Sequence, residues 1–116
     1  MDNNRTYSPY EIVEFVRSIH YRPEDFEEGD IVDRIYENSK YILTEIPLNK
    51  IEKVVYYIDK DIVKEYCEMS PDTMPPVVLG EPYGDESLYP IIDGGHRITT
   101  KIKLKQKKIW AYIPAA

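Results

Sequence analysis

The sequence predicts an α+β domain, a small mixed sheet with helices packed against it, and two observations support this prediction. Apolar residues recur at helical spacing in some segments, whereas other segments are short apolar or alternating runs typical of strands. Proline- and glycine-containing turns separate these segments, and neither an internal repeat nor a low-complexity linker interrupts them. The 116 residues have the length of one domain, which buries about two-thirds of the surface that its unfolded chain exposes.

The first predicted helix begins with a capping box. Ser8 is the expected N-cap, Pro9 occupies the first helical position, and Glu11 closes the box. An apolar stripe follows at helical spacing, formed by Ile12, Val13, Phe15, Val16 and Ile19. Pro23 ends this element.

A loop, a second helix, a strand and a third helix are expected next. The acidic segment 23–30 predicts a loop, and Asp30 caps a helix whose core-facing side chains are Ile31, Val32, Ile35 and Tyr36. Residues 41–46 predict a strand that stops at Pro47, and residues 48–58 show no deciding period. Asp59 caps a third helix with one apolar face, formed by Ile62, Val63, Tyr66 and Cys67.

The last third of the chain predicts a hairpin, a helix and a closing strand. Residues 77–79 are a short apolar strand, residues 81–87 contain Pro82 and Gly84 and predict a turn, and residues 88–92 are the returning strand. A fourth helix is expected over residues 96–105, and the alternating run 109–113 closes the chain as a strand.

Charge and composition limit the classes of function. The net charge of −6 argues against a large basic face laid on DNA, although lysines gather at residues 101–108 and form a local basic patch. The single cysteine, Cys67, has no internal disulfide partner and fits a reducing compartment. A polar N-terminus and the lack of an apolar run of about 20 residues predict a cytoplasmic protein without a membrane span.

The segment from Asp93 to Arg97 predicts a phosphate-binding loop between a buried strand and a helix. Gly94 and Gly95 allow close approach to the main chain, and the first helical turn leaves amides without internal partners. These amides and the helix dipole suit an anion. Arg97 adds a planar fork that matches phosphate oxygens, and His96 adds a donor.

Asp93 has three alternative roles in this loop, and the loop itself has a purely structural alternative. A carboxylate beside a phosphate would hold Mg²⁺ or accept a proton from a reacting hydroxyl, or it would simply cap the helix. Glycine turns between strands and helices also occur for packing alone, with His96 and Arg97 as solvated first-turn residues.

The string from Tyr89 to Arg97, with the strand Pro75–Leu79 before it and a lysine-rich helix and strand after it, resembles the ParB/sulfiredoxin superfamily. The resemblance covers residues 41–116 as one compact unit, and residues 1–40 are an N-terminal helical extension available to a protein partner. It implies nucleotide-phosphate binding, with ATP, ADP or CTP and Mg²⁺. The implied binding residues are Gly94, Gly95, His96, Arg97, Thr99, Thr100 and Lys101, with Asp93, His96 and Arg97 as catalytic residues and Asp93 as metal ligand.

The branches of that superfamily imply different activities. Sulfiredoxins use a cysteine where this chain has Gly95, so reduction of a sulfinic acid is not expected. Partition proteins use an arginine-rich loop that this chain lacks. Free-serine kinases have an Asp-Gly-His-His-Arg string, in which Asp93 would match the aspartate and Glu52 or Glu45 the partner glutamate. The resemblance thus implies an ATP- or CTP-dependent phosphotransferase or NTPase.

Two other functions stay open beside phosphoryl transfer. One is a non-catalytic accessory module of phage or plasmid type that binds a protein or a nucleic acid, and the other is a ParB-like nuclease. The lysines of residues 101–108 form either a nucleic-acid patch or, as we favour, the solvated face of a helix. Trp110 and Tyr112 form either a stacking surface for a base or, as we favour, part of the sheet packing.

Overall fold

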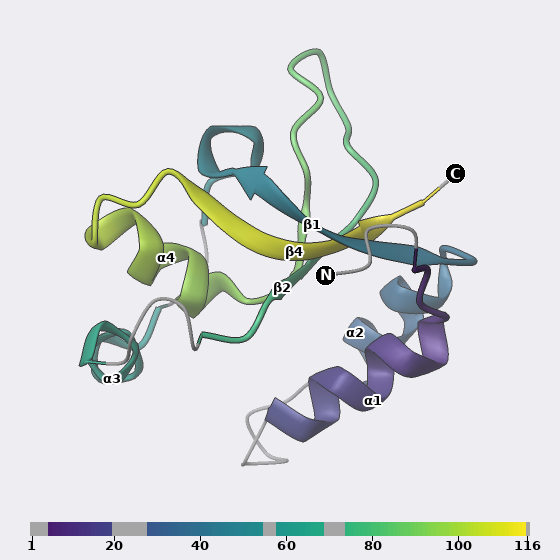
Figure 1. Ribbon diagram of the computed structural model, residues 1–116, viewed down its shortest axis with the longest axis horizontal. Coiled ribbons are helices and arrows are strands. Elements are labelled where there is room, and N and C mark those ends of the chain that lie inside the picture. Colours follow the sequence, from purple (N-terminus) through teal and green to yellow (C-terminus); the bar gives the residue numbers. More distant parts are fainter. Residues whose placement is uncertain (1–4, 20–27, 55–57, 69–73, 116) are drawn as a thin grey trace.

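Helices and strands alternate in a mixed order along the computed structural model, which describes residues 5–19, 28–54, 58–68 and 74–115 (Figure 1). The elements of this described part are α1 (Pro9–Ile19), α2 (Glu28–Tyr36), β1 (Tyr41–Pro47), the 3-10 turn η2 (Leu48–Lys50), α3 (Lys60–Glu68), β2 (Val77–Leu79), β3 (Ile91–Asp93), α4 (Gly95–Lys103) and β4 (Lys108–Pro114).

The four strands form one mixed sheet in the order β1-β4-β2-β3. The long strands β1 and β4 are antiparallel, β2 lies parallel to β4, and β3 returns antiparallel to β2 at the edge. A mixed sheet with helices against it confirms the predicted α+β class.

Each face of the sheet carries its own hydrophobic core, because neighbouring residues of a strand point to opposite faces. Val77 and Leu79 pack on the α4 side, whereas Val78 between them packs on the side of α1 and α2. Likewise Ile91 belongs to the first core and Ile92 to the second. Figure 1 shows α1 and α2 gathered at one side of the sheet and α3 and α4 at another.

Most predicted elements are present, but the second helix differs from its prediction. It begins at Glu28, so Asp30 lies within its first turn and is not the N-cap. One glycine costs a helix only about 1 kcal/mol, and the burial of Ile35 against the sheet outweighs that cost. Tyr36 is 53% exposed and does not face the core; in the third helix Ile62 is likewise on the exposed side.

The hairpin strand and the fourth helix are shorter than predicted. The turn over residues 81–87 is closed by a bridge between Tyr83 and Leu88, but β3 itself starts only at Ile91. Pro90 has no N–H to donate to the ladder, and its carbonyl accepts from the Gly80 amide at 2.9 Å instead. The fourth helix starts one residue early and stops at Lys103.

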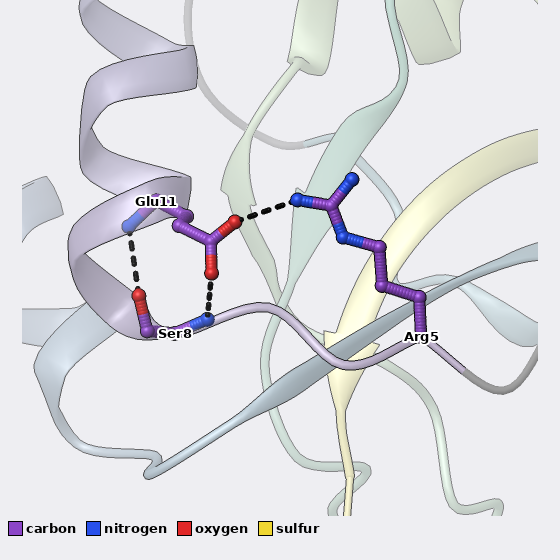
Figure 2. A network of polar contacts seen from close by, with 3 residues as sticks. All are labelled: Arg5, Ser8 and Glu11. Atoms are coloured by element: carbon purple, nitrogen blue, oxygen red, sulfur yellow. Dashed lines mark hydrogen bonds and ion pairs between the residues drawn. The ribbon is translucent and has the colours of Figure 1, made fainter.

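The capping box at the start of α1 is confirmed (Figure 2). The Glu11 amide donates to the Ser8 hydroxyl and the Ser8 amide donates to the Glu11 carboxylate, both at 3.1 Å. Arg5 adds an ion pair to the same carboxylate at 2.9 Å. The bond from the Ser8 amide, with help from Arg5, lowers the pKa of Glu11.

Replacing Ser8 by alanine is expected to lower the free energy of unfolding by about 1 kcal/mol, because one first-turn amide loses its acceptor. The lowered pKa of Glu11 means that the carboxylate stabilises the fold above its unfolded-state pKa, and this contribution is lost as the pH falls through the folded value. Urea unfolding of the Ser8→Ala protein at neutral pH measures the effect. An unchanged midpoint would show that the box contributes nothing.

Two predictions concern residues that the structure largely leaves undescribed. The acidic segment 23–30 and the end of the first helix at Pro23 fall largely outside the described residues. No helix within the described ranges is long and apolar enough to cross a membrane.

Candidate functional site

The predicted loop lies where the edge strand β3 ends and α4 begins. Asp93 is the last residue of β3, Gly94 is the N-cap, and the helix runs from Gly95. Gly94 has φ 121° and ψ 21°, a backbone conformation that side chains with a Cβ rarely adopt. The chain therefore passes from β3 into α4 within the two residues Gly94 and Gly95.

Gly94 also allows a close contact with β2. A Cβ at this position would lie 2.4 Å from Cγ1 of Val77 and 2.9 Å from an Nη atom of Arg97. The backbone of the loop is thus pressed against the sheet, with the Arg97 side chain folded over it.

No side chain of the N-cap residue covers the start of α4. Gly94 supplies no capping side chain, and its carbonyl accepts the Ile98 amide at 2.9 Å, which starts the helical ladder. Amides of a first helical turn have no partner within the helix itself. The start of α4 is therefore not capped by a side chain of its own N-cap residue.

Asp93 and Arg97 form a buried ion pair across this turn. The Arg97 guanidinium donates to Oδ2 of Asp93 at 3.0 Å, and the two side chains are only 4% and 8% exposed. Within the described part of the chain, Nε of Arg97 is buried and has no hydrogen-bond partner. The guanidinium fork, expected to face a phosphate, is thus partly engaged by the protein itself.

His96 connects the first turn of α4 to the start of α3. Its Nε2 accepts the Asp59 amide at 3.0 Å, so in this arrangement the imidazole carries its proton on Nδ1. Asp59 itself is the N-cap of α3, as predicted, because its carboxylate accepts the amides of Asp61 and Ile62. The starts of two helices therefore lie side by side.

The second turn of α4 does not join this group. Thr100 is fully buried and its hydroxyl donates to the His96 carbonyl at 2.8 Å, so that hydroxyl is used within the helix. Thr99 is half-buried, and Lys101 lies about 9 Å from Gly95 along the axis at the usual helical rise. The structure brings residues 93–97 together at the start of α4. The other predicted binding residues, Thr99, Thr100 and Lys101, lie further along the helix.

The two glutamates considered as partners of Asp93 have other positions. Glu52 accepts the Ile91 amide at 2.7 Å and the Tyr83 hydroxyl at 2.8 Å, which fixes the hairpin just before β3. The bond to Glu52 raises the pKa of Tyr83. Glu45 lies on β1, three strands from β3, or about 14 Å at the usual strand spacing. Of the two glutamates, Glu52 is thus the nearer to Asp93, and its carboxylate is bound to the backbone of β3.

The predicted metal ligand of the loop, Asp93, is buried and paired with Arg97. Among the described residues no group of three or more histidine, cysteine, aspartate or glutamate side chains is placed to hold a metal ion. Mg²⁺ commonly takes one or two carboxylates and completes its shell with phosphate oxygens and water. The donor set therefore fits Mg²⁺ only together with a phosphate ligand.

Two contacts of the site were missed by the sequence analysis. The bond between His96 and the Asp59 amide joins residues 37 positions apart, and no local pattern indicates it. The pair of Asp93 and Arg97 has the i, i+4 spacing typical of ion pairs on helices, although Asp93 precedes the helix here. That spacing was a usable signal.

The fold is similar to solved structures of several proteins. Sulfiredoxin from Arabidopsis thaliana matches with a TM-score of 0.51 and 25% identity, over 64% of this chain and 85% of that chain. A free serine kinase in complex with AMP matches with a TM-score of 0.52 and 24% identity, over 61% of this chain and 30% of the kinase. A conserved hypothetical protein from Pyrococcus furiosus matches with a TM-score of 0.53 and 23% identity, over 61% and 31%.

These similarities show a ParB/sulfiredoxin-like fold, as the sequence resemblance implied. The chain spans under a third of the kinase's length. No family model and no curated protein matches the sequence.

Proposed function

We propose that this chain binds a nucleotide by its phosphates at the start of α4, in the loop from Asp93 to Arg97. The glycine N-cap without a capping side chain, the helix dipole and the adjacent guanidinium support the proposal. The likeness in fold to a kinase solved with AMP and with ADP adds to it. Adenine nucleotides are therefore the first ligands to test, with CTP as the comparison.

One observation carries most of the argument, the unpartnered Nε of the buried Arg97. A buried donor without an acceptor costs about 1–3 kcal/mol, and native proteins rarely keep one without a reason. A phosphate oxygen is the acceptor that a guanidinium matches best, since it offers charge and a second oxygen for the neighbouring N–H. A ligand that enters here replaces an uncompensated donor by a charge-assisted bond.

Phosphoryl transfer or NTP hydrolysis is the activity that we propose for the bound nucleotide. Asp93 would hold Mg²⁺ beside the phosphates, and the ion would neutralise charge on them. Arg97 and the loop amides would stabilise charge on the transferred group, and His96 would orient it. A sulfiredoxin reaction is not proposed, because Gly95 stands where that chemistry needs a cysteine and Cys67 lies on α3.

The test is a thermal-shift panel of ATP, ADP, AMP and CTP, each with and without Mg²⁺. A ligand at a hundredfold excess over its Kd stabilises the folded state by about 2.7 kcal/mol. For a chain of this size that raises Tm by roughly 10 °C. Inorganic phosphate at the same concentration shows how much of the shift belongs to the nucleoside.

A matched variant keeps this test specific to the loop. Arg97→Lys retains a positive charge beside Asp93 but removes Nε and the planar fork, so most of the nucleotide shift is expected to vanish. Lys103→Ala, on the exposed side of the same helix, leaves the shift unchanged. Wild-type protein without a shift for any nucleotide at millimolar concentration contradicts the proposal, and so does an equal shift in Arg97→Lys.

A further inference from the structure

A second charged feature lies at the opposite end of α4 from the phosphate loop. A surface hollow of about 580 Å³ opens where the end of α4 meets the start of β4, and four lysines contribute to its wall, Lys101, Lys105, Lys107 and Lys108. The protein as a whole has a net charge of −6, whereas positive charges gather at this groove. We call it the basic groove.

The helix dipole explains only part of this clustering. Lysines near a helix C-terminus are favourable because they face unpaired carbonyls, and Lys101 lies in the last turn of α4. Lys107 and Lys108 come after the helix, beyond the reach of its last turn, and line the same hollow. The helix dipole therefore does not account for Lys107 and Lys108.

Lys105 occupies a backbone position that normally selects glycine. It has φ 58°, and it follows the C-cap of a Schellman motif in which its amide donates to Ile102 and the Gln106 amide donates to Lys101. Glycine is the usual residue there because a Cβ is strained in the left-handed region. A lysine therefore occupies a strained backbone position at the wall of the groove.

Trp110 of β4 and its cross-strand partner Glu45 of β1 also line the groove, from the sheet face opposite α4. Trp110 is 38% exposed, and it lies two residues after Lys108 on β4, so both side chains are on one face of the sheet. Its neighbour on that face, Tyr112, is half-buried and packs edge-on against Tyr7 and Phe15 at 5.0 and 5.1 Å. The packing interpretation of the sequence pattern therefore holds for Tyr112, whereas Trp110 extends beyond the helical cover.

We propose that the basic groove binds single-stranded nucleic acid, with phosphates on its lysines and a base stacked on Trp110. Lysines beside an exposed aromatic ring are the combination that binds single strands, because the cations follow the backbone and the ring stacks on any base. An acidic peptide would use the lysines but offers a flat group for the indole only where it carries an aromatic residue. The volume of the groove lies in the range that holds a nucleotide-sized group.

The experiment uses Trp110 as its own reporter, because the sequence contains one tryptophan. Oligothymidylate and oligouridylate are titrated into the full chain at low salt, and stacking on the indole is expected to quench its fluorescence. The two oligomers distinguish DNA from RNA. The logarithm of the binding constant is expected to fall with the logarithm of salt concentration, by a slope of about −0.7 for each phosphate contacted.

Lys105→Gly separates binding from stability. Glycine removes one cation and relieves the left-handed strain, so the affinity for the oligomer is expected to fall several-fold, with a salt slope shallower by about 0.7, while Tm does not fall. Lys103→Ala removes a lysine from the same helix that does not line the groove and should bind like the wild type. Because Lys105→Gly keeps the fold, weaker binding cannot come from unfolding.

Three outcomes would overturn the proposal. The first is the absence of quenching by either oligomer at low salt. The second is an equal loss of affinity in Lys103→Ala and Lys105→Gly, which would mean general charge attraction. The third is binding of polyglutamate, a polyanion without bases, as tightly as the oligomers, which would identify an acidic protein surface as the partner.

Discussion

Replacement of Gly94 by alanine is expected to lower the free energy of unfolding by roughly 2–5 kcal/mol, the largest effect of any glycine substitution described here. Two costs add up at this position. The backbone at φ 121° is strained for a residue with a Cβ, and the new atom would lie 2.4 and 2.7 Å from two Val77 carbons of a fully buried strand. The loop has to move away from β2, and Arg97 moves with it.

Urea unfolding measures this loss, and Gly84→Ala is the matched control. Gly84 also has a positive φ, of 78°, but a Cβ there meets nothing within 4 Å, so only the backbone strain applies. Its expected cost is about 1 kcal/mol. If both variants lost the same stability, the contact with Val77 would not be the cause.

A double variant tests the contact between a Cβ at Gly94 and the Val77 side chain. Val77→Ala removes the obstructing methyl groups at the expense of a cavity, so adding Gly94→Ala to it should cost less than adding Gly94→Ala to the wild type. The remaining difference combines the backbone strain with the 2.7 Å contact to the Val77 Cβ, an atom that alanine keeps. Strict additivity of the two substitutions would contradict the proposed clash.

Removal of the Asp93 carboxylate is the second change with a large expected effect. In Asp93→Ala the Arg97 guanidinium stays buried without its counterion, and breaking such a pair from one side costs about 3–5 kcal/mol. An exposed pair provides the contrast. Arg17 and Glu14 are both about half exposed, and Glu14→Ala is expected to cost at most about 0.5 kcal/mol.

Rescue by a second substitution tests the cause of that loss. Arg97→Met removes the stranded charge and fills similar space, so Asp93→Ala with Arg97→Met should recover much of the stability lost by Asp93→Ala alone. Denaturant unfolding of the wild type, both single variants and the double variant gives the coupling free energy. A double variant less stable than either single one would rule out the stranded charge.

The burial of Asp93 changes how activity measurements on this site must be designed. A loss of activity in Asp93→Ala does not by itself identify a catalytic carboxylate, because the same substitution disrupts the turn that holds the loop. Arg97→Lys and His96→Gln are better probes. The first keeps a cation beside Asp93, and the second keeps an acceptor for the Asp59 amide where Nε2 of His96 now lies.

Local patterns in the sequence predicted most of the fold. The capping box at Ser8, the cap at Asp59 and the alternation of β4 depend on residues close in the chain, so spacing and residue type are sufficient. The start of α2 and the exposure of Tyr36 depend on how that helix meets the sheet. Tertiary packing decided both, against the local signals.

The sequence predicted which residues form the candidate site, but not how their side chains are arranged. The glycine turn and the adjacent arginine follow from five consecutive residues, and the structure places them at a helix start as expected. The burial of Arg97 against Asp93 and the contact of His96 with Asp59 arise from β2 and α3 closing over the loop. The contact of His96 with Asp59 joins distant segments and leaves no periodic signal, whereas the i, i+4 spacing of Asp93 and Arg97 does.

The alternation of Ile91 and Ile92 has a consequence for where an independent folding unit begins. The part of the chain that resembles sulfiredoxin in fold covers about two-thirds of its length, yet Ile92 and Val78 within the sheet are buried beneath side chains of α1 and α2. In a chain shortened to residues 41–116, Val78 of β2 and Ile92 of β3 would be exposed to water on the face that α1 and α2 cover. Helices α1 and α2 therefore cover one face of β2 and β3, and a substitution that loosens this packing is expected to disturb the start of α4, which follows β3 directly.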